Sequence, residues 1–155
     1  MIGADSALYR LRVAEGFLDE ARQDMSLRRW RSVMDNAQLA VENAAKTVLA
    51  LLGPVGRTHN PTPLLQQALR DGRLAISAPE RVERLAELAG LLGFDVHVQT
   101  DYGDEMAGHT PWELFGETDA RQALAMAEEA VSLAREIVQE IRAGGYGQGH
   151  PPPGH

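Results

Sequence analysis

The chain contains no cysteine, which excludes disulfide bonds and thiolate metal ligands. Lysine is almost absent too, because Lys46 is the only lysine among the 15 basic residues. Aromatic residues make up 5% of the sequence, so a folded interior must consist mainly of Leu, Val, Ala and Met. The longest apolar run, Thr47 to Leu52, is too short to cross a bilayer. Such a composition favours closely packed helices.

The first nine residues lack the basic start and apolar run of a signal peptide, so we expect a cytoplasmic protein with no membrane contact. The formal net charge is −7, which disfavours broad attraction to phosphate backbones. A local basic patch is still allowed, because three arginines flank Trp30. Arg28, Arg29 and Arg31 are therefore candidate phosphate contacts, unless they are solvated side chains where two helices meet.

A length of 155 residues fits one domain, and apolar residues spaced by three and four predict helices almost throughout. The expected helices run over about Ser6 to Met25, over Arg28 to Leu52, over a short segment from Thr62, from Ser77 onward, and from Thr118 onward. Thr62 and Ser77 carry the signature of helix caps, and Glu80 stands at the reciprocal capping-box position after Ser77. Gly93 to Glu117 is expected to be an apolar-rich loop packed on the helices.

The predicted fold is an all-α, antiparallel up-and-down bundle of four to five helices over residues 1–143. Residues 144–155 are rich in Gly, Pro and His and are expected to form a disordered tail. The second helix carries more than one apolar stripe, which predicts a second copy packed against it as a homodimer. Tyr102 and Trp112 are expected in the core or in an interface.

Several short stretches carry a resemblance to a known family. They are Trp30 with the run Ala37-Gln38-Leu39-Ala40-Val41-Glu42-Asn43-Ala44-Ala45-Lys46-Thr47-Val48-Leu49, then His59-Asn60 with Leu64-Leu65, then Asp101-Tyr102-Gly103-Asp104-Glu105, and finally Pro111, Glu113, Phe115 and Asp119-Ala120. Together they resemble the HEPN domain family over Leu8 to Ile141. The resemblance implies a bundle of about five helices, frequently dimeric, in a family that includes ribonuclease toxins and partners of small nucleotidyltransferases.

The ribonucleases of this family use an arginine followed, after four to six residues, by a histidine. None of the five histidines here has an arginine five to seven residues before it. Where relatives often carry an Arg-Tyr step, this chain has Asp101-Tyr102, which reverses the charge that would face a phosphate. We therefore expect no catalytic residue. The resemblance indicates a non-catalytic interaction module, a homodimer that partners a nucleotidyltransferase-type protein in a toxin–antitoxin or related two-component system.

A second interpretation stays open, in which the chain acts on RNA or binds nucleotides. The candidate ligand groove consists of Glu42, Lys46, Asp101, Tyr102, Asp104 and Glu105. In this interpretation Arg57 joins Lys46 and the arginines beside Trp30 as a phosphate contact, and Asp101, Asp104 or Glu105 acts as acid or base. The alternative for Glu42 and Lys46 is an ion pair on the helix surface.

Metal chemistry is the third possibility. His97, His109 and the carboxylates between them offer imidazole and carboxylate ligands, but no two of them stand one turn apart on a predicted helix. The EF-hand motif is excluded, because Met106 and Trp112 occupy the positions that need Gly and Glu. We predict neither a metal nor a cofactor. His59 is expected to hydrogen-bond the backbone of its own turn.

Overall fold

A computed structural model describes residues 2–149, with side chains for residues 3–144. Its helices are α1 (Ile2–Ser26), α2 (Trp30–Ala50), α3 (Thr62–Arg70), α4 (Pro79–Leu91), α5 (Phe94–Tyr102), α6 (Pro111–Leu114) and α7 (Glu117–Gly149). The residues described contain no strand, only one isolated bridge between Asp104 and His109. The predicted all-α bundle is confirmed.

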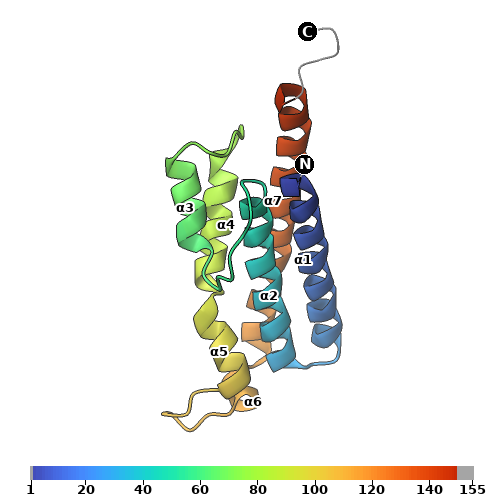
Figure 1. Cartoon of the computed structure of the whole chain (residues 1–155). Coiled ribbons are helices and arrows are strands. Elements are labelled where there is room, and N and C mark those ends of the chain that lie inside the picture. Colours follow the sequence, from blue (N-terminus) through green and yellow to red (C-terminus); the bar gives the residue numbers. More distant parts are fainter. Residues whose placement is uncertain (1, 150–155) are drawn as a thin grey trace.

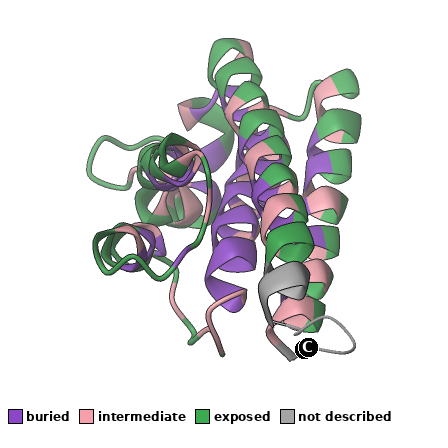
Figure 2. Cartoon of the chain, turned by 90° about the horizontal axis from the view of Figure 1, so that it is seen from above, coloured by how far each residue is buried: buried purple, intermediate pink, exposed green. Residues whose placement is uncertain are grey.

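Helix α2 lies at the centre of the molecule (Figure 1). Helices α1 and α7 pack along one side of it, while α3, α4 and α5 cover the other side, with α5 continuing below α4. Fourteen of the 21 residues of α2 are buried, and Figure 2 shows the buried residues concentrated on the inner faces of the helices. The α2 positions that suggested more than one apolar stripe, one of them for a second copy, are all buried within one chain: Met34, Ala37, Ala40, Val41, Ala45 and Val48. The α2 stripes therefore provide no surface for a dimer.

Alanine is the most frequent buried residue on α1, α2 and α7. The fully buried alanines include Ala14, Ala37, Ala44, Ala127 and Ala134. A small side chain at these positions lets helix axes approach closely, and the larger Val and Leu residues fill the remaining space. The scarcity of aromatics in the sequence thus corresponds to a tightly spaced core.

The segment that was expected to be a loop, Gly93 to Glu117, contains α5 and α6. The prediction failed because Phe94, Val96 and Val98 alternate in sequence, and α5 places them on both of its faces. Val96 is half-buried against the core, whereas Phe94 and Val98 are exposed. A helix is recognised in a sequence by apolar residues spaced by three and four. Because α5 packs on one side and exposes apolar side chains on the other, its apolar residues are spaced by two, and the sequence did not predict it.

Two predicted caps are wrong. The residue before α4 is Ala78, and Ser77 instead donates from its backbone N–H and its hydroxyl to Glu140 on α7. The hydroxyl of Thr62 donates to the carbonyl of Ala86, 3.0 Å away, and so connects α3 to α4. Both polar side chains make tertiary contacts, which a local sequence rule cannot foresee.

Helix α7 continues through Gly149, past the expected end of the folded domain at residue 143. Residues 150–155 lie outside the described part of the chain, so the disordered tail stays a prediction there. No helix in the described residues is long and apolar enough to cross a membrane.

Candidate functional site

Glu42 and Lys46 form a buried ion pair in the middle of α2. The Lys46 Nζ lies 3.1 Å from the Glu42 Oε2, and the residues are only 9% and 5% exposed, respectively. They are not the exposed helix-surface pair that the sequence left as one alternative. Burying a charged group costs free energy unless the group is paired, so the burial of Glu42 and Lys46 depends on the hydrogen bonds around them.

Two further side chains complete the environment of the Glu42 carboxylate. The Gln38 Nε2 and the His59 Nδ1 each lie 3.3 Å from its Oε1. His59 comes from the loop between α2 and α3 and stacks on Phe94 and His97 of α5, with ring centroids 5.6 Å away in both cases. His59 therefore reaches the core helix, whereas the sequence predicted a bond to its own turn. This cluster holds the loop and α5 against α2.

The acidic half of the candidate groove lies elsewhere. Asp101, at the end of α5, is 3.9 Å from Arg31, and Arg31 also donates to the carbonyl of Thr100 at 2.6 Å. Arg31 precedes Glu42 by 11 residues, which corresponds to roughly 16 Å along α2. Tyr102 is 76% exposed, so it is not a core residue. The six groove residues are thus divided between the centre and one end of the bundle.

Asp104 and Glu105 belong to a projecting turn at residues 103–109, which we call the Met106 turn. The backbone N–H of Asp104 donates to the His109 carbonyl at 2.8 Å, and the reverse bond measures 2.9 Å. Gly103 has a φ of +69°, and a Cβ placed there would lie 2.2 Å from the carbonyl oxygen of His109. Glycine is therefore required where α5 enters the turn.

The three arginines beside Trp30 line a surface cleft of about 460 Å³ at the same end of the bundle. Its walls are Arg28, Arg29, Trp30, Arg31, Ser32, Trp112 and Phe115, and we call it the arginine–tryptophan cleft. The Arg28 guanidinium lies 5.6 Å from the Trp30 ring centroid, and that of Arg31 lies 5.8 Å from the Trp112 ring centroid. The cleft thus presents guanidinium groups beside aromatic rings, an arrangement suited to an anionic group with a flat or apolar neighbour.

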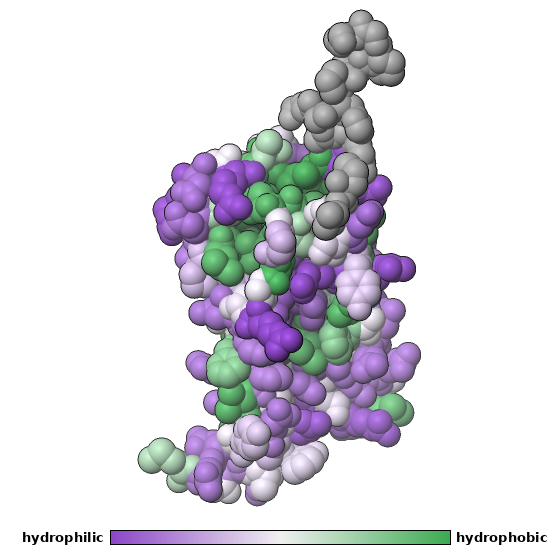
Figure 3. All heavy atoms as spheres, viewed as in Figure 1, coloured by the Kyte–Doolittle hydropathy of each residue, from purple (hydrophilic) through white to green (hydrophobic). Residues whose placement is uncertain are grey.

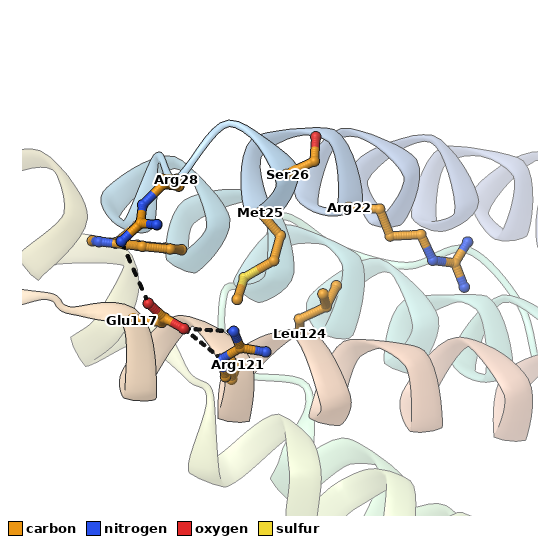
Figure 4. Close-up of a pocket in the computed structure, with 8 residues that line it drawn as sticks. Arg22, Met25, Ser26, Arg28, Glu117, Arg121 and Leu124 are labelled. Atoms are coloured by element: carbon orange, nitrogen blue, oxygen red, sulfur yellow. Dashed lines mark hydrogen bonds and ion pairs between the residues drawn. The ribbon is translucent and has the colours of Figure 1, made fainter.

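A second, smaller pocket of about 330 Å³ shares Arg28 and Trp30 with this cleft. In it, Glu117 lies between Arg28 and Arg121 (Figure 4). The Arg121 guanidinium donates to the Glu117 carboxylate and lowers the pKa of Glu117, with a smaller contribution from Arg28. Because Glu117 contacts Arg121 closely and Arg28 only at 3.9 Å, Arg28 keeps much of its capacity for another anion.

Trp112 was not predicted as a site residue, and its position follows from α6. Thr110 and Glu113 form a reciprocal capping box that starts this four-residue helix. The N–H and hydroxyl of Thr110 donate to the Glu113 carboxylate and lower the pKa of Glu113. The sequence Thr-Pro-Trp-Glu contains this capping box, so it could have predicted the start of α6 and with it the position of Trp112.

Among the described residues, no group of three His, Asp or Glu side chains is placed to hold a metal ion. His97 stacks on the exposed ring of His59, while His109 closes the Met106 turn. The structure separates the two histidines that the sequence offered as ligands.

The chain was compared with known proteins. None of the curated proteins matches it. The HEPN domain matches residues 7–141, which is most of the chain and nearly the range of the resemblance found in the sequence. With an all-α bundle over the same residues, the chain belongs to the HEPN domain family.

Proposed function

We propose that this chain is a non-catalytic HEPN interaction module. It forms a homodimer and binds a nucleotidyltransferase-type protein in a toxin–antitoxin or related two-component system. Family membership supports a bundle of this kind, and the absence of an arginine five to seven residues before any histidine argues against the family ribonuclease reaction.

The observation that carries the proposal is the exposure of apolar side chains at one end of the bundle. This chain has eight aromatic residues, and three of them, Phe94, Tyr102 and Trp112, are between 47% and 76% exposed around α5 and α6. Val98 and Met106 are exposed beside them. Figure 3 shows a few hydrophobic residues among hydrophilic ones at this end, while a larger hydrophobic area of the same face lies at the opposite end. Exposed apolar groups concentrated in one region are typical of a protein interface.

The test measures binding and cleavage separately. Tyr102→Ser should weaken binding to the nucleotidyltransferase-type protein of the same system by about tenfold, as measured by calorimetry. Tyr9→Ser is the matched control, because Tyr9 is 59% exposed at the opposite end of α1 and its loss should leave binding unchanged. RNA cleavage by the wild type that disappears in Asp101→Ala would overturn the non-catalytic assignment.

A second candidate, nucleotide or RNA binding, is supported by the arginine–tryptophan cleft. Its arginines can contact phosphate, and the exposed ring of Trp112 can stack on a base. The two tryptophans of the chain both line this cleft, so intrinsic fluorescence reports on it directly. Quenching by an oligouridine that Arg29→Ala reduces, and Arg142→Ala does not, would favour this candidate, because Arg142 is an exposed residue far along α7 from the cleft.

A further inference from the structure

We propose that the Met106 turn of one copy of this chain binds in the arginine–tryptophan cleft of a second copy. The inference rests on the proposed homodimer and specifies its interface. This interface takes the place of the apolar stripes of α2, which are covered within each chain and cannot contact a second copy.

The Met106 turn has a fixed conformation before any partner binds. Its two ends are joined by the paired backbone hydrogen bonds between Asp104 and His109. The Gly103 N–H donates to the Gln99 carbonyl at 2.8 Å and so fastens the turn to α5. A preformed turn loses little conformational entropy on binding.

The tip of this turn carries an apolar group next to a carboxylate. Met106 is fully exposed, with 102% of its reference area accessible, so its own chain leaves it uncovered. Asp104 accepts a hydrogen bond from the Ala107 N–H and stabilises the turn, whereas the neighbouring Glu105 is exposed. The tip therefore offers a thioether for an aromatic ring and a carboxylate for a guanidinium.

The cleft offers the complementary groups. Trp112 is 73% exposed, and the Arg28 side chain is 77% exposed. Arg29 makes no side-chain hydrogen bond or ion pair with any residue in the described part of the chain. The carboxylate of Glu105 can pair with the guanidinium of Arg28 or Arg29. The net negative charge of the chain does not oppose a contact between two such groups.

The turn and the cleft lie at the same end of the molecule, at the bottom of Figure 1, where α5, α6 and the α1–α2 connection meet. A two-fold axis at this end would pair each turn with the cleft of the other copy. Such an interface is self-complementary and contains the Glu105–arginine contact twice. A single substitution consequently changes two contacts per dimer.

Charge reversal tests the interface. Arg29→Glu and Glu105→Arg should each raise the dissociation constant of the dimer by about tenfold or more, measured by analytical ultracentrifugation. The double variant exchanges the two charges across the interface and restores an opposite-charge pair, so it should regain most of the wild-type affinity. Arg57→Glu and Glu136→Arg are matched controls on exposed residues elsewhere and should leave the dimer unchanged.

The outcomes distinguish this inference from the proposed function. A wild type that stays monomeric at micromolar concentration would overturn both the homodimer and its interface. A dimer that is insensitive to both single reversals would overturn only the interface. Loss of dimer in the single variants without recovery in the double variant would also overturn the Glu105–Arg29 pairing.

Met106→Ser provides an independent readout, because it removes the apolar anchor and leaves the charges unchanged. In the wild type, dilution that dissociates the dimer should shift tryptophan emission to longer wavelength as Trp112 becomes exposed. Met106→Ser should show the shifted emission at all concentrations, and Leu64→Ser, on the exposed face of α3, should behave like the wild type. Unchanged emission in the Met106 variant would contradict contact between the turn and Trp112.

Discussion

At the scale of single residues, the least expected feature is the charge inside α2. Sequence spacing correctly placed Glu42 and Lys46 one turn apart, but spacing does not tell which side of a helix faces solvent when nearly all sides are covered. Gln38, Glu42 and Lys46 follow one another on the same face of α2 and are all buried. Their burial depends on the His59 loop and on α5. The loop was not predicted to contact α2, and α5 was not predicted as a helix.

Lys46→Met should destabilise the fold by about 3 kcal/mol, because it leaves the buried carboxylate of Glu42 without its cationic partner. The measurement is urea unfolding at neutral pH. Adding Glu42→Gln should recover part of the loss, since the remaining amide no longer needs a counter-charge. Asp19→Asn is the control for an exposed pair, with Arg22, and should cost less than about 1 kcal/mol. Equal costs for the two pairs would contradict the buried placement.

Gly103→Ala should lower stability by at least about 2 kcal/mol and disrupt the Met106 turn. The positive φ and the contact of the added Cβ with the His109 carbonyl both oppose the substitution. Gly108→Ala makes a close comparison, because Gly108 has a φ of +77° but no atom within 4 Å of an added Cβ. We expect that change to cost about 1 kcal/mol, from backbone strain alone. Chemical denaturation of both variants checks the difference.

At the scale of elements, helices with one continuous apolar face were predictable, whereas α5 and α6 were not. Helices α1, α2, α3, α4 and α7 lie where they were expected, apart from the earlier start of α1 and the later end of α7, because their apolar residues recur every three or four positions over two or more turns. Helix α5 has nine residues with apolar groups on two faces, so its pattern resembles neither an amphipathic helix nor a half-buried strand for long enough to decide. Its outward face is also the candidate interface.

The contact between α4 and α7 should be sensitive to acid. Ser77 and Arg81 both donate to the Glu140 carboxylate, and the N–H and hydroxyl of Ser77 are the main reason that the pKa of Glu140 is lowered from 4.5. A carboxyl whose pKa is lower in the folded state stabilises the fold fully above its unfolded value of 4.5. This contribution is lost as the pH falls through the lower folded pKa.

Glu140→Gln should therefore lower the melting temperature more at pH 7 than at pH 3, because the stabilisation by the wild-type carboxylate decreases once the pH falls below 4.5. Thermal unfolding followed by circular dichroism at both pH values checks this. Glu136→Gln is the control, because Glu136 is an exposed residue one helical turn earlier on α7. An equal loss of melting temperature at both pH values would show that Glu140 acts through packing and not through its charge.

At the scale of the whole molecule, the sequence supported the family and the bundle but misassigned the surface for a partner. The sequence pattern of α2 reveals more than one apolar stripe. Only the assembled fold shows that α1, α7, α4 and α5 cover all of these stripes. Likewise, three candidate phosphate contacts were correctly grouped around Trp30, whereas the other wall of their cleft, Trp112, lies more than 80 residues later. Surfaces formed by distant segments cannot be deduced from spacing in one segment.

The proposed dimer combines an ion pair with an apolar contact, so its affinity should fall with ionic strength without vanishing. Raising NaCl from about 50 mM to about 500 mM shortens the Debye length severalfold and screens the exposed Glu105–arginine contacts. We expect the dissociation constant of the wild type to rise by about three- to tenfold, as measured by ultracentrifugation. The Arg29→Glu and Glu105→Arg single variants should respond in the opposite direction, because salt screens the repulsion that they introduce. A dimer equally stable at both salt concentrations would require an interface held by apolar contacts alone, which would place it away from the arginine–tryptophan cleft.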